Sequence, residues 1–159
     1  MLDNTNLINT IFSFLNGIGI STQEKRIQEP TFLPGIKIEK GILFIDRNQL
    51  KYPGDLLHEA GHIAVMTPKE RSIISGNIME HKPDNESDEM AAILWSYAAL
   101  RHLNLAPEIV FHPEGYKNDS QWLIENFEQD RFIGLPLLEW MGMTDSDSFP
   151  KMKHWLRKN

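Results

Sequence analysis

The chain has 159 residues, no cysteine and a formal net charge of −6, from 16 Lys and Arg against 22 Asp and Glu. This length predicts one domain, spanning residues 1–159, with a core of its own. The scattered acidic charge argues against a surface for nucleic acid or for an anionic membrane, and the lack of cysteine excludes disulfides, thiolate metal sites and cysteine nucleophiles. A protein without cysteine fits a cytoplasmic location, which is the one we expect.

The N-terminal segment predicts an amphipathic core helix over residues 5–16. Its apolar residues recur at helical spacing, and Gly17 follows as the expected end. The apolar run is broken by Asn9, Ser13 and Asn16, so it lacks the stretch of about 20 apolar residues that a membrane span needs. We therefore expect neither a signal peptide nor a membrane-spanning helix here.

A hairpin or a pair of short strands is predicted over residues 36–45, where alternating apolar residues flank a turn at 39–41. The second strand leads towards "GDLLHEAGHIAV", residues 54–65. This stretch predicts a helix that starts near Pro53 to Asp55, with Asp55 near the cap, and ends before Pro68.

The remaining elements are predicted to be mainly helical. The connection at 67–86 is long enough that it should line a site or contain a strand such as "RSIIS", residues 71–75. The run at 87–105 predicts a long, largely buried helix that Pro107 prevents from continuing. A loop, a helix at 120–129 capped by Ser120 and a short helix near 135–142 follow, and the basic residues 151–159 fit an amphipathic terminal helix.

The helix at 54–65 contains the pattern H-E-x-x-H, from His58 to His62. Residues four apart on a helix lie one above the other, so His58 and His62 can bind one ion while Glu59 reaches a water on that ion. Two neutral imidazoles suit Zn²⁺, which lowers the pKa of its water to about 7, so that Glu59 can act as the general base. These three are the only polar side chains between residues 56 and 66, so the helix should be buried nearly all round and they need a shared internal partner.

Gly61, inside the same motif, bears on how the helix packs. Glycine costs about 1 kcal/mol relative to alanine in a helix interior, which indicates that another element packs too close for a side chain. The alternative is ordinary helix packing.

A catalytic zinc site usually has three protein ligands and a water, so a third ligand must come from elsewhere in the chain. The helix that begins near residue 86 offers Glu86, Asp88 and Glu89. Acidic residues in a first turn usually face solvent, whereas Glu89 lies one turn further in, in phase with the core-facing residues. We expect Glu89 to be the third ligand, with Glu86 as the alternative and a plain acidic first turn as the interpretation without a metal. Asp88 or Glu86 could then orient a histidine ligand.

The loop "FHPEGY", residues 111–116, offers two more polar side chains, His112 and Tyr116. Peptide hydrolysis needs a hydrogen-bond donor for the oxyanion, and either side chain could supply it as part of the catalytic group. A solvated loop with a structural tyrosine is the alternative.

The segment of strands, then "LLHEAGH" on a helix, then a carboxylate on a second helix resembles the gluzincin metallopeptidases. Within them it is most similar to the compact ImmA/IrrE-type proteins, over about residues 36–100. The resemblance implies a zinc-dependent peptidase with His58, His62 and Glu89 as ligands and Glu59 as general base. The second helix departs from the family pattern at Ala91, where the family usually has Asn or Asp.

The sequence thus predicts an α+β fold: a mostly helical, minimal zincin-like domain with a small sheet or hairpin before the H-E-x-x-H helix. The expected function is that of a zinc-dependent hydrolase, a peptidase acting on a peptide or protein. The alternative is a metal-binding regulatory or protein-interaction module that cleaves nothing. A fourth protein ligand, such as His112 or Asp88, would favour the module, because structural zinc sites are normally closed by protein side chains.

Overall fold

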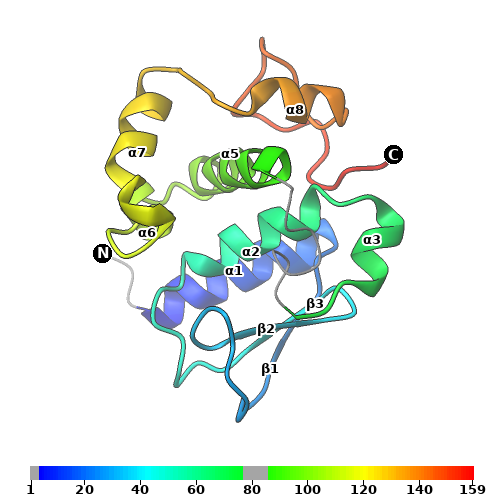
Figure 1. Ribbon diagram of the computed structural model, residues 1–159, viewed down its shortest axis with the longest axis vertical. Helices are drawn as coiled ribbons and strands as arrows, with labels where there is room; N and C mark the ends of the chain where they lie inside the picture. Colours follow the sequence, from blue (N-terminus) through cyan, green and yellow to red (C-terminus); the bar gives the residue numbers. More distant parts are fainter. Residues whose placement is uncertain (1–3, 77–85) are drawn as a thin grey trace.

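A small three-stranded sheet lies against a set of helices in this computed structural model, which describes residues 4–76 and 86–159, without the side chains of 86 and 87 (Figure 1). The predicted α+β class is confirmed, because the sheet precedes most of the helical chain. The N-terminal helix α1 (Asn4–Ile18) is also confirmed, and it buries Leu7, Ile11 and Leu15 on one face. No helix of the described residues combines the length and apolar character needed to cross a membrane.

The sheet has the strand order β1-β3-β2, with β1 at Thr22–Glu24, β2 at Ile36–Glu39 and β3 at Ile42–Ile45. The predicted hairpin is β2 and β3, which pair antiparallel around a turn whose Lys40 and Gly41 both have positive φ. The alternate apolar residues of the hairpin face the core, as a half-buried sheet requires. β1 pairs with β3 in parallel and was not predicted.

The motif helix α2 (Asp55–Ala64) packs chiefly against the long helix α5 (Glu86–His102). Figure 1 shows α5 on one side of α2, with α1 and the sheet on the other. Nine of the ten α2 residues are buried and His58 is half-buried, which confirms the prediction of a helix buried nearly all round.

The two helices come closest at Gly61. A Cβ atom at this position would lie 2.7 Å from the carbonyl oxygen of Ala92 and 3.3 Å from the ring of Trp95. The prediction that another element packs too close for a side chain at Gly61 is therefore confirmed. This close crossing brings the faces of α2 and α5 that carry the motif histidines and Glu89 together.

The predicted strand at 71–75 is wrong, because residues 68–73 form the helix α3 (Pro68–Ile73). Thr67 caps this helix by accepting a hydrogen bond from the backbone N–H of Glu70, and Pro68 takes the first helical position. After α3 the chain runs along the hairpin, where the N–H of Gly76 donates to the Ile38 carbonyl at 2.9 Å. Residues 77–85 of this connection lie outside the described residues.

The C-terminal part covers α5 and the end of α2. Its elements are α6 (Pro107–Val110), the 3₁₀ turn η1 (Tyr116–Asn118), α7 (Ser120–Glu128) and α8 (Leu135–Trp140). The helices predicted at 120–129 and 135–142 are confirmed. Ser120 is not the cap of α7, since Asp119 precedes it in that position and the Ser120 hydroxyl donates instead to the His112 carbonyl at 2.6 Å.

The predicted terminal helix over residues 151–159 is wrong, because this tail forms bends and turns. Its backbone bonds to other elements. The Trp155 carbonyl accepts from the Trp95 indole at 2.9 Å, and the Arg157 N–H donates to the Ala64 carbonyl at 2.9 Å. The tail thus satisfies carbonyls at the C-terminal end of α2, which have no partner inside that helix.

Candidate metal centre

His58 and His62 of α2 and Glu89 of α5 meet in one cluster. Their ligand atoms all lie within 4.8 Å of one another. The Nε2 atom of His62 is 2.7 Å from one Glu89 oxygen, and the Nε2 atom of His58 is 3.5 Å from the other. The structure therefore brings together the three side chains that the sequence predicts as metal ligands.

The local structure explains this convergence. A spacing of four residues places His58 and His62 on one face of α2, with ring centroids 4.8 Å apart. Glu89 precedes Ala92 by three residues, so it lies one turn back on the face of α5 that crosses α2 at Gly61. The absent side chain at Gly61 thus helps to set the distance between the carboxylate and the two imidazoles.

The donor set fits zinc. Two imidazoles and one carboxylate form a known catalytic zinc ligand set, in which water or substrate takes the remaining position. Within the described residues, no other His, Asp or Glu joins the group. His112 and Asp88, which could have closed the site, are not among its members.

The pKa values of the two histidines in the cluster shift in opposite directions. Burial, together with the nearby His62, lowers the pKa of His58 to about 3, so this imidazole is neutral at physiological pH. Burial alone would also lower the pKa of His62, but its contact with Glu89 raises that pKa above the ordinary value. The same contact outweighs the burial of Glu89 and lowers the pKa of that carboxyl.

Glu59 is a buried carboxyl beside the cluster. Its side chain is only 9 % exposed, and burial raises its pKa to about 7. A carboxyl with a pKa near neutrality can both take and return a proton, which is the property that a general base needs.

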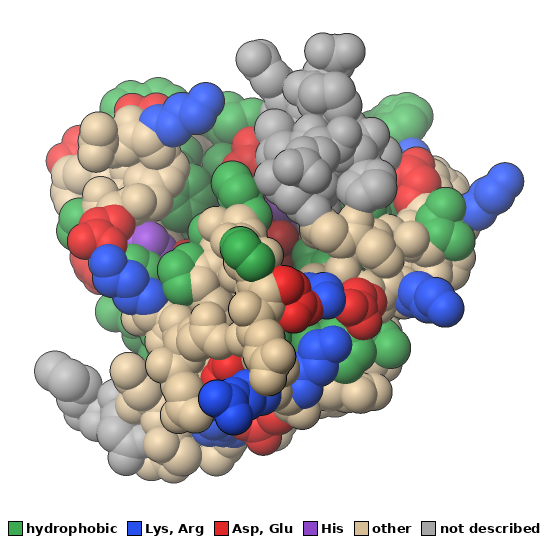
Figure 2. All heavy atoms as spheres, turned by 60° about the horizontal axis from the view of Figure 1, so that its bottom comes forward, with side chains coloured by type: hydrophobic (Ala, Val, Ile, Leu, Met, Phe, Trp, Pro, Cys, Tyr) green, Lys and Arg blue, Asp and Glu red, His purple; other side chains and the backbone are tan. Residues whose placement is uncertain are grey.

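The cluster lies in the wall of a cavity of about 430 Å³. The loop before β2, the start of α2 and the loop around Tyr116 form the other walls, and Glu59 reaches this cavity too. Figure 2 shows small areas of histidine set back between hydrophobic and acidic side chains on this face. The candidate ligands are therefore reachable from outside.

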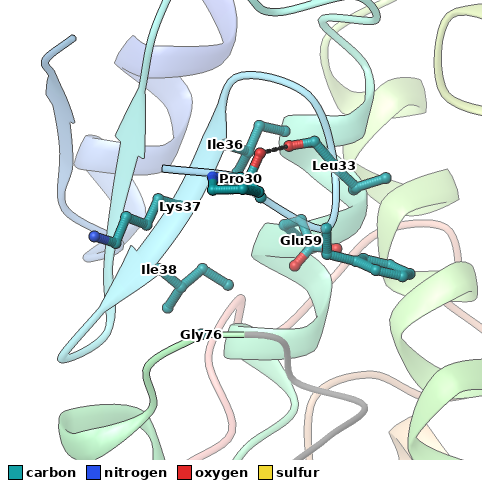
Figure 3. A pocket seen from close by; sticks show the side chains of 9 residues that line it. Pro30, Leu33, Ile36, Lys37, Ile38, Glu59 and Gly76 are labelled. Atoms are coloured by element: carbon teal, nitrogen blue, oxygen red, sulfur yellow. Dashed lines mark hydrogen bonds between the residues drawn. The ribbon is translucent and has the colours of Figure 1, made fainter. Parts of the chain in front are cut away.

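A second hollow of about 340 Å³ adjoins the first and shares Phe32, Leu33 and Glu59 with it. Its walls are mostly apolar, and Figure 3 shows Ile36 and Ile38 of β2 bordering it opposite Glu59 of α2. The carboxyl of Glu59 thus lies where the cavity of the candidate ligands and an apolar hollow meet.

His112 lies near the cluster but is held by Asp55. The Nε2 atom of His112 is 2.7 Å from an Asp55 oxygen, and the ring stacks on Tyr52 at 3.7 Å between centroids. The Nδ1 atom of His112 is buried and has no hydrogen-bond partner among the residues that the structure describes. The role of His112 as an oxyanion donor stays a prediction, and in this geometry one ring nitrogen is already engaged.

Asp55 is a site residue that sequence reasoning missed, because its predicted place near the helix cap already accounted for it. It does follow the N-cap residue Gly54, and its carboxylate joins the His112 ring. Burial raises the pKa of Asp55. Its position three residues before His58 on the same helical face was the available signal.

Tyr116 places its hydroxyl 3.1 Å from Nδ1 of His58, with the two rings in an edge-to-face contact. Burial raises the pKa of this hydroxyl well above its ordinary value, so Tyr116 stays protonated. The predicted role as an oxyanion donor is untested, and the observed contact is with a candidate ligand.

The other two acidic residues at the start of α5 are Asp88 and Glu86. Asp88 acts electrostatically to raise the pKa of His62, and its predicted orienting role stays a prediction. The side chain of Glu86, the alternative ligand, lies outside the described residues.

Comparison with known proteins identifies no relative. The chain matches no protein-family model, no curated protein and no solved structure. The interpretation of the site therefore depends on its geometry and chemistry.

Proposed function

We propose that the protein is a zinc-dependent hydrolase that cleaves peptide bonds, and that His58, His62 and Glu89 hold the ion. The observation that carries this proposal is the convergence of these three ligands from two helices in the wall of a cavity that Glu59 also reaches. Because the comparisons identify no relative, the likeness to gluzincin metallopeptidases stays part of the proposal. So does a cytoplasmic location, which the lack of cysteine favours.

Zinc at this position would polarise the scissile carbonyl and supply a water with a pKa of about 7. Glu59 takes the proton of the attacking water and later returns it to the leaving amine. Without an ion its pKa is about 7, and a bound cation would favour the ionised form, which is the form that accepts the proton. His58 stays neutral, as a zinc ligand must be, and His62 is held by Glu89 at 2.7 Å.

A peptide substrate is favoured by the adjoining hollow. A ligand that spans both spaces extends from the candidate ligands past Glu59 into an apolar pocket beside β2. β2 carries two charged residues, Lys37 and Glu39, which pair with each other at 2.6 Å, and the Lys37 side chain points away from the hollow in Figure 3. The hollow thus fits an apolar side chain of a chain-like substrate.

The alternative, a metal-binding module without activity, needs a closed metal site. In the described part of the chain, His112 is paired with Asp55 and no fourth side chain joins the ligand group. This geometry supports the hydrolase over the module.

The test compares the parent with Glu59→Gln on a peptide library. We expect the parent to carry zinc in a one-to-one ratio, and Glu59→Gln to keep the zinc but lose cleavage by about 10²- to 10⁴-fold, because the general base is gone. Glu128→Gln, an exposed position at the end of α7, is the matched control and should cleave like the parent. Absence of zinc from the parent, or equal cleavage by Glu59→Gln, contradicts the proposal.

A further inference from the structure

The loop before β2 presents an exposed aromatic side chain at the point where the two hollows adjoin. Phe32 is 66 % exposed, although single exposed apolar side chains are common on protein surfaces and carry no function by themselves. Phe32 differs from such residues in its position. It lines both the cavity of the candidate ligands and the apolar hollow beside β2. A ligand that extends from one space into the other therefore passes the Phe32 ring.

The loop that carries Phe32 is tied at both ends to Asp46, a buried residue just after β3. An Asp46 side-chain oxygen accepts a hydrogen bond from the Ile27 backbone N–H at 3.0 Å. The backbone N–H of Asp46 donates to the Gly35 carbonyl at 2.9 Å. The Gln49 side chain donates to the same carboxylate oxygen at 2.8 Å, so the buried carboxylate is well partnered. Both ends of the loop are thus fixed to the end of the sheet.

The backbone next to Phe32 is restricted as well. Pro30 and Pro34, on either side of it, each have a φ angle that the pyrrolidine ring fixes. Leu33 packs against the core and forms a β-bridge with Ile36, the first residue of β2. A ligand that covers the Phe32 ring therefore needs to order little of the loop, so less of the binding free energy is lost as conformational entropy.

The hollow beside Phe32 suits one large apolar side chain. Its volume of about 340 Å³ is at the lower end of the range of about 300–1,000 Å³ that is typical of small-ligand sites. Ile36 and Ile38 border it opposite Glu59 (Figure 3). An aromatic or large aliphatic side chain here would remove the Phe32 ring from water, whereas a small side chain would leave much of the ring exposed.

We propose that Phe32 is a specificity-determining residue, which selects peptides that have an aromatic or large aliphatic side chain beside the cleaved bond. Glu59 lies in the walls of both spaces, so a side chain in the hollow belongs to a residue close to the bond on which the proposed general base acts. The inference rests on the proposed function for the cleavage itself. Binding of the side chain in the hollow requires neither an ion nor catalysis, so it can be tested separately.

The binding test titrates N-acetylphenylalanine amide into the purified protein and follows the ¹³C-labelled methyl groups of Ile36 and Ile38 by NMR. This probe should shift both methyl signals, and N-acetylalanine amide should shift them much less. Phe32→Ala should weaken binding of the phenylalanine probe by roughly two- to tenfold, and Phe32→Leu should weaken it less because an apolar contact remains. Ile73→Ala is the matched control, since Ile73 is 68 % exposed but lines neither hollow, and it should bind the probe like the parent.

The cleavage test uses two peptides that differ only in having phenylalanine or alanine beside the cleaved bond. The parent should have the higher kcat/KM on the phenylalanine peptide, and Phe32→Ala should reduce this preference by roughly two- to tenfold while it cleaves the alanine peptide like the parent. Isoleucine methyl signals that ignore the phenylalanine probe, or a Phe32→Ala variant with the parent's probe affinity and preference, overturn the inference. A protein that binds the probe through Phe32 but cleaves no peptide contradicts the proposed function and supports the selectivity of the hollow.

Discussion

Glu59 combines burial with a position beside two histidines and a second carboxylate. Water is largely excluded from its side chain, so its ionised form is poorly solvated, and this raises the pKa from an ordinary 4.5 to about 7. A bound cation would favour the ionised form again. Without a metal, the ionised Glu59 carboxyl therefore destabilises the fold. With a metal bound, it is the proposed general base.

This raised pKa predicts a pH dependence of stability for the chelator-treated protein. The folded state binds the Glu59 proton more tightly than the unfolded state, so the corresponding stability is fully present below pH 4.5 and is lost as the pH rises through about 7. The difference between the two pKa values corresponds to roughly 3 kcal/mol. Glu59→Gln should lack this decline, so its unfolding free energy relative to the parent should rise by up to that amount between pH 5 and pH 8.5.

Urea unfolding at the two pH values measures this difference. The comparison cancels the contributions of the other titrating groups, including His62 and Glu89, to the extent that the variant leaves them unchanged. Parallel pH profiles for the parent and Glu59→Gln would show that the carboxyl is not buried as described.

The crossing of α2 and α5 is the element-level feature that makes the site possible. Each helix alone carries an incomplete set of candidate ligands, two on α2 and one on α5. The close approach at Gly61 removes the space that would otherwise separate them. The geometry of the candidate metal centre should therefore respond to a single methyl group at this position.

Gly61→Ala should lower the unfolding free energy by about 1–3 kcal/mol and weaken zinc binding, because its Cβ would press on the Ala92 carbonyl and move the helices apart. Gly17→Ala in α1 is the matched control. A Cβ there meets nothing within 4 Å, so this change should be neutral or stabilise by up to about 1 kcal/mol. Urea unfolding measures the stability of both variants, and chelator competition measures their zinc affinity. A Gly61→Ala variant that matches the parent in both measurements would contradict the close crossing of α2 and α5.

Apolar spacing in the sequence was sufficient to predict α1 and the β2–β3 hairpin, because each buries a regular set of apolar residues. The helices α2 and α5 are buried nearly all round over much of their length, and their apolar runs and flanking prolines predicted them. Apolar spacing could not predict β1, whose three residues are half-buried or exposed and show no apolar alternation. The helix α3 could have been predicted from Thr67, Pro68 and Glu70, a helix-start signature that the neighbouring isoleucines obscured. The terminal tail was missed because its hydrogen-bond partners belong to other elements.

In the site, too, contacts set by local spacing were predicted and contacts between distant segments were not. Local spacing on two helices predicted that His58, His62 and Glu89 would share one place, and the structure brings them together. The partners of Asp55 and Tyr116 lie 57 and 58 residues away in the chain, so no local pattern encodes them. Such contacts arise only when the loop after α6 folds back over the start of α2.

The whole molecule holds α2 at both ends. At the N-terminal end, the pair of Asp55 and His112 fastens the loop that carries Tyr116. At the C-terminal end, Arg157 donates to the carbonyls of Ala64 and Val65, while Trp155 accepts from Trp95 of α5. Segments far apart in sequence thus fix the helix that carries two of the three candidate ligands against the helix that carries the third.

Metal-edge anomalous diffraction from crystals of the zinc-loaded protein tests the central claim most directly. We predict one anomalous peak about 2.0–2.2 Å from the Nε2 atoms of His58 and His62 and from a Glu89 oxygen, with no fourth protein ligand. An ion bound elsewhere, or a site closed by His112 or Asp88, would contradict this account, and the closed site would favour a metal-binding module over a hydrolase.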